Sequence, residues 1–239
     1  MRERKKQVGV GAALPAGLLA LAMLAGCGIL PAPEGPTVLS DTRPGNLNLV
    51  VVVQDMISDA SLQPALNVTF LFQTDSGHAV RLVKGETVIC GDTALQNNDS
   101  SFDGQVPIPA DPSTPISCTY TSGTAAADIS FVLPPTPVIL SPKAGDTVTR
   151  AKDLTVLYTP SGGRGIQATA ENGTVRGAVT GLQQPDNGRY GPLDTTQLQP
   201  GAGRVVVDRE YASRTLSDSG FRAAQLNMRV DGAIDVTWT

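Results

Sequence analysis

Residues that could carry out catalysis are scarce in this chain of 239 residues, which contains one histidine, His78, and three cysteines. Nucleophilic catalysis by serine or cysteine needs a general base within hydrogen-bonding reach, and histidine is the usual base. His78 directly follows a glycine in a predicted hairpin turn, where an imidazole is solvated rather than part of a triad. The sequence has no nucleophile elbow, zincin motif or phosphate-binding loop. It therefore predicts a protein that is not an enzyme.

Three stretches could bind a ligand or carry acid chemistry, but none has the required spacing. A glycosidase needs two carboxylates, and nothing singles out a pair among Asp186, Asp194 and Asp208. A calcium loop needs the spacing Asp-x-Asp-x-Asp-Gly, which is missing from the oxygen-rich run formed by Asn97, Asn98, Asp99 and Asp103. The run Gly-Gly-Arg-Gly at residues 162–165 precedes no helix, so we interpret it as a hairpin loop rather than a phosphate site. We expect no metal and no cofactor.

The N-terminus has the anatomy of an export signal. Four basic residues within the first six precede an apolar segment, residues 8–24, which is rich in small residues and contains Pro15. A stable membrane-spanning helix would have bulkier residues and no central proline. The segment runs into the tetrad Leu24, Ala25, Gly26 and Cys27, which resembles the lipobox of bacterial lipoproteins.

This resemblance implies that Cys27 receives a diacylglyceryl group, that residues 1–26 are removed as a signal peptide, and that the freed amine is acylated. Acyl chains contribute about 0.8 kcal/mol per buried methylene, and two or more chains anchor a protein stably. We therefore expect a lipid-anchored protein of the cell membrane that faces the extracytoplasmic side. The alternatives are an ordinary secretory signal with a chance cysteine, or an uncleaved anchor helix.

The remainder after residue 26 has 213 residues, enough for one large or two small domains. The leader holds four of the 18 basic and one of the 22 acidic residues, so the remainder carries a net charge of −7. Scattered net negative charge disfavours a nucleic-acid partner. Residues 27–45 are rich in proline and glycine without periodicity, which predicts a flexible tether.

Residues 46–134 predict a first antiparallel β-sandwich, because short alternating runs recur between turn signals. Expected strands are residues 47–54, 66–72, 78–83, 87–90, 116–120 and 127–132. Residues 91–104 are expected to form a polar loop, either without regular structure or with one weak strand. Cys90 and Cys118 are an even pair in an exported chain, so we expect a structural disulfide. Two thiols and one histidine are too few ligands for a zinc site.

A proline-rich stretch around residues 133–137 predicts a stiff hinge to a second domain, residues 137–239. The phrase Ile-x-Ser-Pro-x-x-Gly-x-x-Val begins at Ile139, and an alternating strand over residues 154–159 follows it. This opening resembles that of bacterial immunoglobulin-like domains of surface proteins, which implies an immunoglobulin-like sandwich and says little about function. Further strands are expected at residues 166–170, 175–179, 188–190, 204–209, 221–230 and 233–238. The predicted fold class is all-β, with two immunoglobulin-like antiparallel sandwiches.

The function prediction is a non-catalytic, lipid-anchored envelope protein that serves as a surface-displayed binding, adhesion or spacer module. Exposed edge strands would allow an envelope protein to bind by strand addition. The alternative is a carbohydrate- or ligand-binding accessory subunit of a surface complex, with a glycan as partner. An aromatic row on one face would support it, drawn from Tyr190, Tyr211, Phe221 and Trp238, although Trp238 on an alternating strand is expected in the core. An enzyme of unrecognised type is a distant third.

Overall fold

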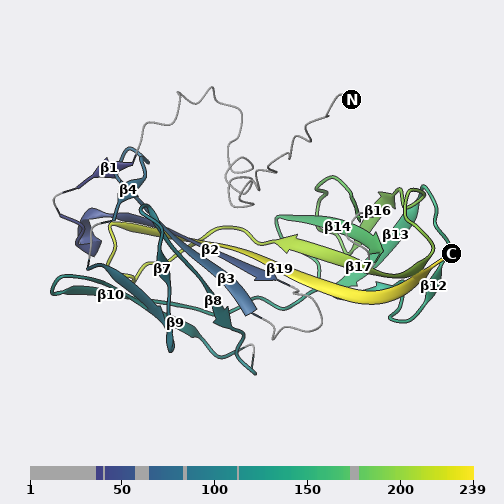
Figure 1. The fold of residues 1–239 in the computed structure, drawn as a ribbon, viewed down its shortest axis with the longest axis horizontal. Helices are drawn as coiled ribbons and strands as arrows, with labels where there is room; N and C mark the ends of the chain where they lie inside the picture. The colour runs from purple at the N-terminus through teal and green to yellow at the C-terminus, as the bar shows by residue number, and fades with distance from the viewer. Residues whose placement is uncertain (1–35, 40, 57–64, 83–84, 112, 173–177) are drawn as a thin grey trace, which may run out of the picture. The chain divides into compact units, whose positions relative to one another are not determined.

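The computed structural model describes residues 36–39, 41–56, 65–82, 85–111, 113–172 and 178–239 (Figure 1). Apart from the short 3-10 turn η3 (Pro44–Asn46), their regular structure consists of β-strands, so the all-β prediction is confirmed. Residues 35–239 form one compact unit. The described part of the chain contains no helix of sufficient length and hydrophobicity to span a bilayer. The predicted signal peptide, residues 1–26, lies outside the described residues.

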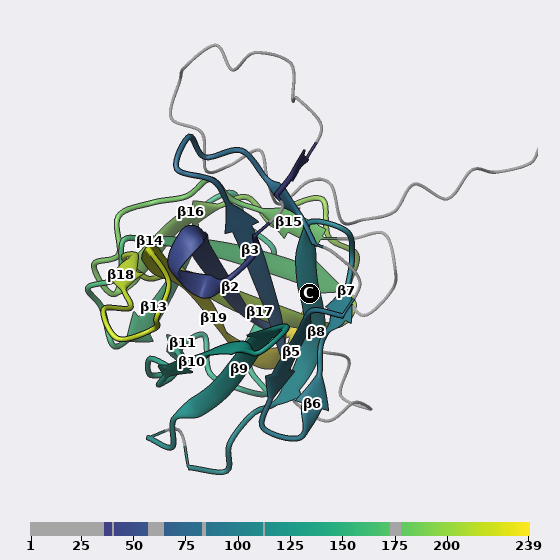
Figure 2. The same cartoon turned by 90° about the vertical axis from the view of Figure 1, so that its left-hand side faces the viewer.

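Two hydrophobic cores divide the compact unit into two β-sandwich lobes, which we call lobe 1 and lobe 2. Lobe 1 packs a four-stranded sheet of order β10-β9-β5-β6 against one part of a ten-stranded sheet. Figure 2 shows these two layers from the end of the molecule. The strands of the smaller sheet are β5 (Thr87–Cys90), β6 (Thr93–Ala94), β9 (Ile116–Ser122) and β10 (Ala125–Phe131). Those of the larger sheet in lobe 1 are β2 (Asn48–Met56), β3 (Ala65–Gln73), β7 (Gln96–Asn97), β8 (Ser101–Pro107) and the first half of β19 (Ala223–Trp238).

The strict alternation of β3 explains why it forms a strand in this position. Its inward side chains, Leu66, Val68, Phe70 and Phe72, are fully buried, whereas Asn67 and Thr69 face outward. A two-residue period places alternate side chains on opposite faces of a sheet, so one face enters the core and the other meets solvent. The aromatic rings of lobe 1 gather around Phe72, whose ring centroid lies 4.8 Å from that of Tyr120.

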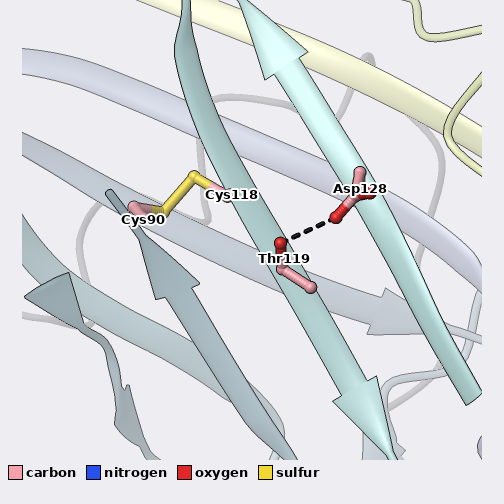
Figure 3. The surroundings of a disulfide bond; sticks show 4 residues. All are labelled: Cys90, Cys118, Thr119 and Asp128. Carbon is pink, nitrogen blue, oxygen red and sulfur yellow. Dashed lines mark hydrogen bonds between the residues drawn. A yellow bond between two sulfur atoms is a disulfide. The ribbon is translucent and has the colours of Figure 1, made fainter. Parts of the chain in front are cut away.

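The predicted disulfide is present and joins the two middle strands of the smaller sheet of lobe 1 (Figure 3). Cys90 on β5 lies opposite Cys118 on β9, and both side chains are buried. On the outer face of the same sheet, Thr119 donates a hydrogen bond of 2.7 Å to Asp128 of β10. The bridge therefore reinforces a pair of strands that backbone hydrogen bonds already connect.

Lobe 2 packs a three-stranded sheet of order β11-β13-β16 against the other part of the ten-stranded sheet. Its core is built mainly from small aliphatic side chains, with Tyr190 and Trp238 among its largest members. The strands of the smaller sheet are β11 (Val138–Ser141), β13 (Leu154–Thr159) and β16 (Arg189–Leu193). The facing strands are β14 (Gly165–Asn172), β15 (Ala178–Thr180), β17 (Gly201–Glu210) and the second half of β19.

The last strand, β19, belongs to both lobes (the long yellow strand of Figure 1). Residues 223–229 pair in parallel with β2, and residues 229–238 pair antiparallel with β17. At about 3.3 Å per residue, its 16 residues span roughly 50 Å. The sequence predicted two strands here, residues 221–230 and 233–238. Gly232 instead continues the strand, and its lack of a side chain makes room for the carbonyl of Pro137 in the segment between the lobes.

Four further strands of two residues each complete the fold, and the first pair of them differs from expectation. Residues 78–83 were predicted as the hairpin partner of β3, and Ala79 forms an antiparallel bridge with Gln73 at the end of β3. The strand β4 (Val80–Arg81) then pairs in parallel with β1 (Thr37–Val38). The other short strands, β12 (Thr147–Val148) and β18 (Arg214–Thr215), both pair with β19. Part of the predicted tether also packs on lobe 1, where Tyr120 donates a hydrogen bond of 2.9 Å to the carbonyl of Thr42.

The region predicted as a polar loop, residues 91–104, contains β6, β7 and the start of β8. The chain crosses from one sheet to the other at Leu95, which is buried in the core of lobe 1. Gly104 on β8 faces Leu95, and a side chain there would collide with it. The buried side chain of Leu95 therefore fixes the crossing. The predicted domain boundaries at residues 46–134 and 137–239 stay a prediction, and they assign β19 to the second domain alone, although both lobes share this strand.

Candidate functional site

The described residues do not include the predicted lipidation site, Cys27, or the other residues of the lipobox, Leu24, Ala25 and Gly26. Lipidation therefore stays a prediction. His78 is exposed in the turn that follows β3, as expected. Within the described residues, no group of three or more His, Cys, Asp or Glu side chains could hold a metal ion.

The acidic residues considered for catalysis lie apart, each beside its own partner. Asp194 accepts hydrogen bonds from the backbone and hydroxyl of Thr196, which lower the pKa of the carboxyl below its ordinary value. Asp208 pairs with Arg229 across neighbouring strands. The oxygen-rich loop also bonds within itself, because Asn98 donates to Asp103 at 2.9 Å. These groups form no shared acid–base site.

Asp186 and Arg209 form a buried ion pair in lobe 2 that the sequence analysis missed. Arg209 Nε lies 2.7 Å from Asp186 Oδ2, and the two side chains are 1% and 0% exposed. The Nε–H has no acceptor in line, and the hydrogen bond of the pair is instead the one of 3.3 Å that Arg209 Nη2 donates to Asp186 Oδ1. Gly163 of the glycine-rich loop donates its backbone N–H to Asp186 Oδ2 at 2.6 Å. The loop that looked suited to phosphate thus holds an internal carboxylate.

Two tyrosines complete the cluster around Arg209. Its guanidinium lies 5.7 Å from the ring centroid of Tyr158 and 5.6 Å from that of Tyr211. Tyr158 donates to Asp186 Oδ1 at 2.9 Å, and its pKa is raised to about 12 by burial and by this bond. Tyr211 receives a hydrogen bond from Arg209 and donates one of 2.9 Å to the carbonyl of Pro135. The cluster therefore ties lobe 2 to the segment between the lobes.

The position of Arg209 on an alternating strand could have identified it, from the sequence alone, as a buried charged residue. Val205 and Val207 are fully buried, so the two-residue period of β17 places residue 209 on the same inward face. A charged side chain at an inward position needs an opposite charge nearby. Its partner, Asp186, lies in the loop before β16, and no local pattern connects the two residues.

A hollow on the outer face of lobe 1 is the best candidate for a binding site. It has a volume of about 600 Å³ and lies over β2, β3 and β8, beside β6 and β7. We call it the amide groove, and its polar lining residues are Gln54, Asn67, Thr69, Thr93, Gln96, Asp103 and Gln105. A smaller hollow of about 280 Å³ lies in lobe 2 beside Thr155, Asn187 and Arg189.

Strand register places the side chains of the amide groove in two rows. Gln54, Asn67 and Gln105 are directly opposite one another on three neighbouring strands, β2, β3 and β8. In the second row, Asp103 of β8 lies between its partners on β3 and β7, Thr69 and Gln96. Directly opposite residues on one face have Cβ atoms about 5 Å apart. The groove floor is therefore a regular array of carboxamides, a hydroxyl and one carboxylate.

The polar groups of this array differ in how firmly they are held. Ser101 and Asn98 donate hydrogen bonds of 2.5 and 2.9 Å to Asp103, which fixes its carboxylate. Within the described part of the chain, the side chains of Gln54, Thr69 and Gln105 make no hydrogen bond. Gln54 and Thr69 are nevertheless half-buried. The groove thus presents donors and acceptors that a ligand can engage without breaking a bond within the protein.

The four aromatic residues considered as a carbohydrate platform do not form an exposed row. Trp238 and Tyr190 are buried in lobe 2, and Trp238 donates its Nε1–H to the carbonyl of Glu171 at 2.9 Å. Tyr211 and Phe221 pack against the core of lobe 1. The prediction that Trp238 belongs to the core is confirmed.

These features define an all-β protein built from two β-sandwich lobes. No protein family and no curated protein sequence matches the chain. The titin domains Z1Z2, solved in complex with telethonin, show 11% identity and a TM-score of 0.20 over 83% of this chain and 95% of theirs. The IG1+IG2 domains of DIP-gamma show 10% identity and a TM-score of 0.21 over 81% of this chain and 95% of theirs. Likeness at this level carries no information about function.

Proposed function

We propose that this chain is a lipid-anchored protein of the cell envelope, without catalytic activity, whose joined lobes display a binding surface away from the membrane. The basic and apolar N-terminus and the tetrad ending in Cys27 support the anchor. The Cys90–Cys118 disulfide supports an oxidising, extracytoplasmic location, because such bonds are rare in reducing compartments.

The observation that carries this proposal is where the chain enters the compact unit. Asn48, the first residue of β2, pairs with Ala223, whereas Gln54 near its end pairs with Arg229, where β19 passes into lobe 2. Residues 36–46 therefore lie at the end of lobe 1 that is farthest from lobe 2 (Figure 1). A chain anchored at Cys27 would reach lobe 1 first and hold lobe 2 beyond it.

Three links make the two lobes suitable as a stiff spacer. β19 runs through the large sheet of both lobes, and Gly232 packs against the carbonyl of Pro137. Tyr211 packs on the core of lobe 1 and hydrogen-bonds both Arg209 and Pro135. A stiff, tethered body confines its binding surface near the membrane, which raises the effective concentration for partners in the envelope.

The anchor is tested by the intact mass of the protein extracted from membranes. We expect the mass of residues 27–239 plus a diacylglyceryl group and usually a further acyl chain. The Cys27→Ser variant should keep its leader and carry no lipid. An unlipidated wild-type protein in the soluble fraction would contradict the proposal.

The stiffness is tested separately with spin labels on a soluble form, residues 28–239. Ser130→Cys in lobe 1 and Lys152→Cys in lobe 2 are exposed positions for a pair that spans the two lobes. Ser76→Cys with Ser130→Cys gives a matched pair within lobe 1. We expect the distance distribution between lobes to be as narrow as that within lobe 1. A broad or bimodal distribution between the lobes would overturn the spacer role.

A further inference from the structure

We infer that the amide groove of lobe 1 binds a neutral glycan, which would supply the ligand class of the proposed envelope module and therefore rests on that proposal. The groove volume of about 600 Å³ is typical of small-ligand sites. Its two registered rows place polar groups of three kinds on one floor: carboxamides, hydroxyls and one carboxylate. This mixture of polar groups determines which ligands the groove can bind.

Carboxamides suit sugar hydroxyls because both groups donate and accept hydrogen bonds. The side chains of Gln54 and Gln105 each offer two N–H donors and one carbonyl acceptor. Adjacent hydroxyls of a sugar can therefore bind one carboxamide at both its oxygen and its nitrogen. Asp103 adds an acceptor whose orientation is set by Asn98 and Ser101. Charged acceptors make hydrogen bonds about twice as strong as neutral ones.

The charges and side chains around the groove disfavour other ligands. Among the described residues that line it there is no lysine, arginine or histidine, and the charged one, Asp103, repels anions. Arg229, which lies beside Gln54 on β19, is already paired with Asp208. The apolar lining residues are Val68, whose side chain points into the core, and the small Ala94. Peptide-binding grooves use pockets that receive side chains of the ligand, and this floor supplies none that is apolar. A neutral, polyhydroxylated ligand fits the groove best.

The position of the groove agrees with display on an anchored protein. Gln54 pairs with Asn67 on one side and with Arg229 of β19 on the other, near the point where β19 passes into lobe 2. The groove thus lies at the end of lobe 1 opposite the point where the chain enters. A ligand in the surrounding envelope would reach it without first meeting the anchored end.

The test titrates soluble, oxidised protein, residues 28–239, with maltohexaose, cellohexaose, mannohexaose and chitohexaose. The side-chain NH₂ signals of Gln54, Asn67 and Gln105 report binding directly in ¹H–¹⁵N spectra. We expect at least one of these neutral hexasaccharides to shift these signals, with a dissociation constant in the millimolar range or tighter. Gln54→Ala/Gln105→Ala should weaken that binding at least tenfold. Gln225→Ala, an exposed carboxamide on β19 of the same sheet, is the matched control and should bind as the wild type does.

Four results would overturn the inference. They are no binding to any of the four sugars, binding only to an anionic oligosaccharide such as hexagalacturonate, binding only to a tri-alanine peptide, and sugar binding that leaves the three side-chain signals unmoved. The side-chain signals of the wild-type protein test the inference even if the double variant fails to fold. If the groove binds no neutral sugar, the intact mass of the lipidated protein is unaffected. If the proposed anchor is wrong, the intact mass shows it and the sugar titration does not.

Discussion

The two lobes share an architecture but are stabilised in different ways. Lobe 1 has a disulfide and a cluster of aromatic rings, in which Tyr120 and Phe221 pack 5.6 Å apart between centroids. Lobe 2 has a core of smaller side chains and a buried ion pair, Arg209 with Asp186. The difference shows two solutions for small sandwiches, which bury too little apolar surface to be stable without further links.

The lobes also differ in which parts of the chain supply their strands. The strands of lobe 2 all come from residues 138–238, whereas lobe 1 takes its last strand from residues 223–230, which follow most of lobe 2. Ala224, Leu226 and Met228 of that strand are buried in the core of lobe 1. Lobe 1 is therefore complete only after nearly the whole chain has been made.

The largest effect should follow from isolating lobe 1 at the boundary that the sequence suggests. A fragment of residues 36–134 lacks Leu226 and Met228, whose burial contributes about 1.5–3 kcal/mol each, and it exposes the edge of β2. Since domains have only about 5–15 kcal/mol of stability in total, we expect the fragment to be unfolded or aggregated. ¹H–¹⁵N spectra of the fragment measure this.

Adding a synthetic peptide of residues 221–231 should restore a dispersed spectrum, and a peptide of scrambled sequence should not. A well-dispersed spectrum of the fragment alone would show that lobe 1 does not depend on β19. The two lobes would then no longer differ in whether they need a strand from a distant part of the chain.

The ion pair of lobe 2 should produce the next largest effect. Arg209→Met leaves the carboxylate of Asp186 buried without its partner, and loss of one member of a buried pair costs about 3–5 kcal/mol. Arg209→Met with Asp186→Asn removes both charges, so the double variant should be more stable than the sum of the single effects implies. Urea unfolding of the four proteins in the cycle measures the coupling.

An exposed pair provides the control for this cycle. Arg81 lies 3.3 Å from Asp99, and their side chains are 53% and 74% exposed. Arg81→Met should cost less than about 1 kcal/mol, because exposed ion pairs contribute little. Equal costs for Arg81→Met and Arg209→Met would mean that burial does not strengthen the pair in lobe 2.

Removal of the disulfide of lobe 1 should lower the free energy of unfolding slightly less than loss of the ion pair of lobe 2 does. Cys90→Ala/Cys118→Ala opens a loop with a sequence separation of 28, which the chain-entropy model values at about 3–4 kcal/mol. Trp238, the one tryptophan of the chain, is buried in lobe 2 and reports on that lobe alone. Because β19 joins the lobes, we expect the fluorescence of Trp238 to show the lowered unfolding midpoint. An unchanged Trp238 midpoint, with a separate earlier transition in circular dichroism, would show that the lobes unfold independently.

Local patterns in the sequence predicted most of the strands but not the way they join. The expected strands at residues 87–90 and 154–159 coincide with β5 and β13, because alternation and turn residues specify them locally. The pairing of β19 with β2 joins residues about 175 positions apart. No local pattern encodes such a partner, and the sequence predicted two separate strands, residues 221–230 and 233–238, in place of β19.

The candidate site was predicted less well than the fold. Cys90 and Cys118 were found from their number and context, but the amide groove was not, since Asn67, Gln105 and Gln54 look like ordinary outward residues of separate strands. They become a site only through register across β2, β3 and β8. The feature that makes such a floor a site is geometric, and for the segment after Cys90 that supplies Gln96 the sequence indicated only a polar loop with room for one weak strand.

The smallest effect concerns the pH dependence of lobe 2 through Tyr158. Burial, with the hydrogen bond to Asp186, raises its pKa to about 12 from the ordinary value near 10. An unfolded chain therefore loses this proton first as the pH rises. The contribution of Tyr158 to stability is complete below about pH 10 and falls between pH 10 and 12. Tyr158→Phe removes the hydroxyl, at a cost of about 1 kcal/mol at neutral pH, together with this pH dependence.

Urea midpoints of wild type and Tyr158→Phe, compared from pH 8 to pH 12, isolate this residue from the other tyrosines. The gap between the two proteins should stay constant up to about pH 10 and then narrow, because only the wild type loses the contribution of Tyr158. The neighbouring charges set the direction: the carboxylate of Asp186 disfavours the phenolate, whereas Arg209 favours it less strongly. A gap that widens above pH 10 would mean that the guanidinium dominates, and the tyrosine would then stabilise lobe 2 as an ion rather than as a hydrogen-bond donor.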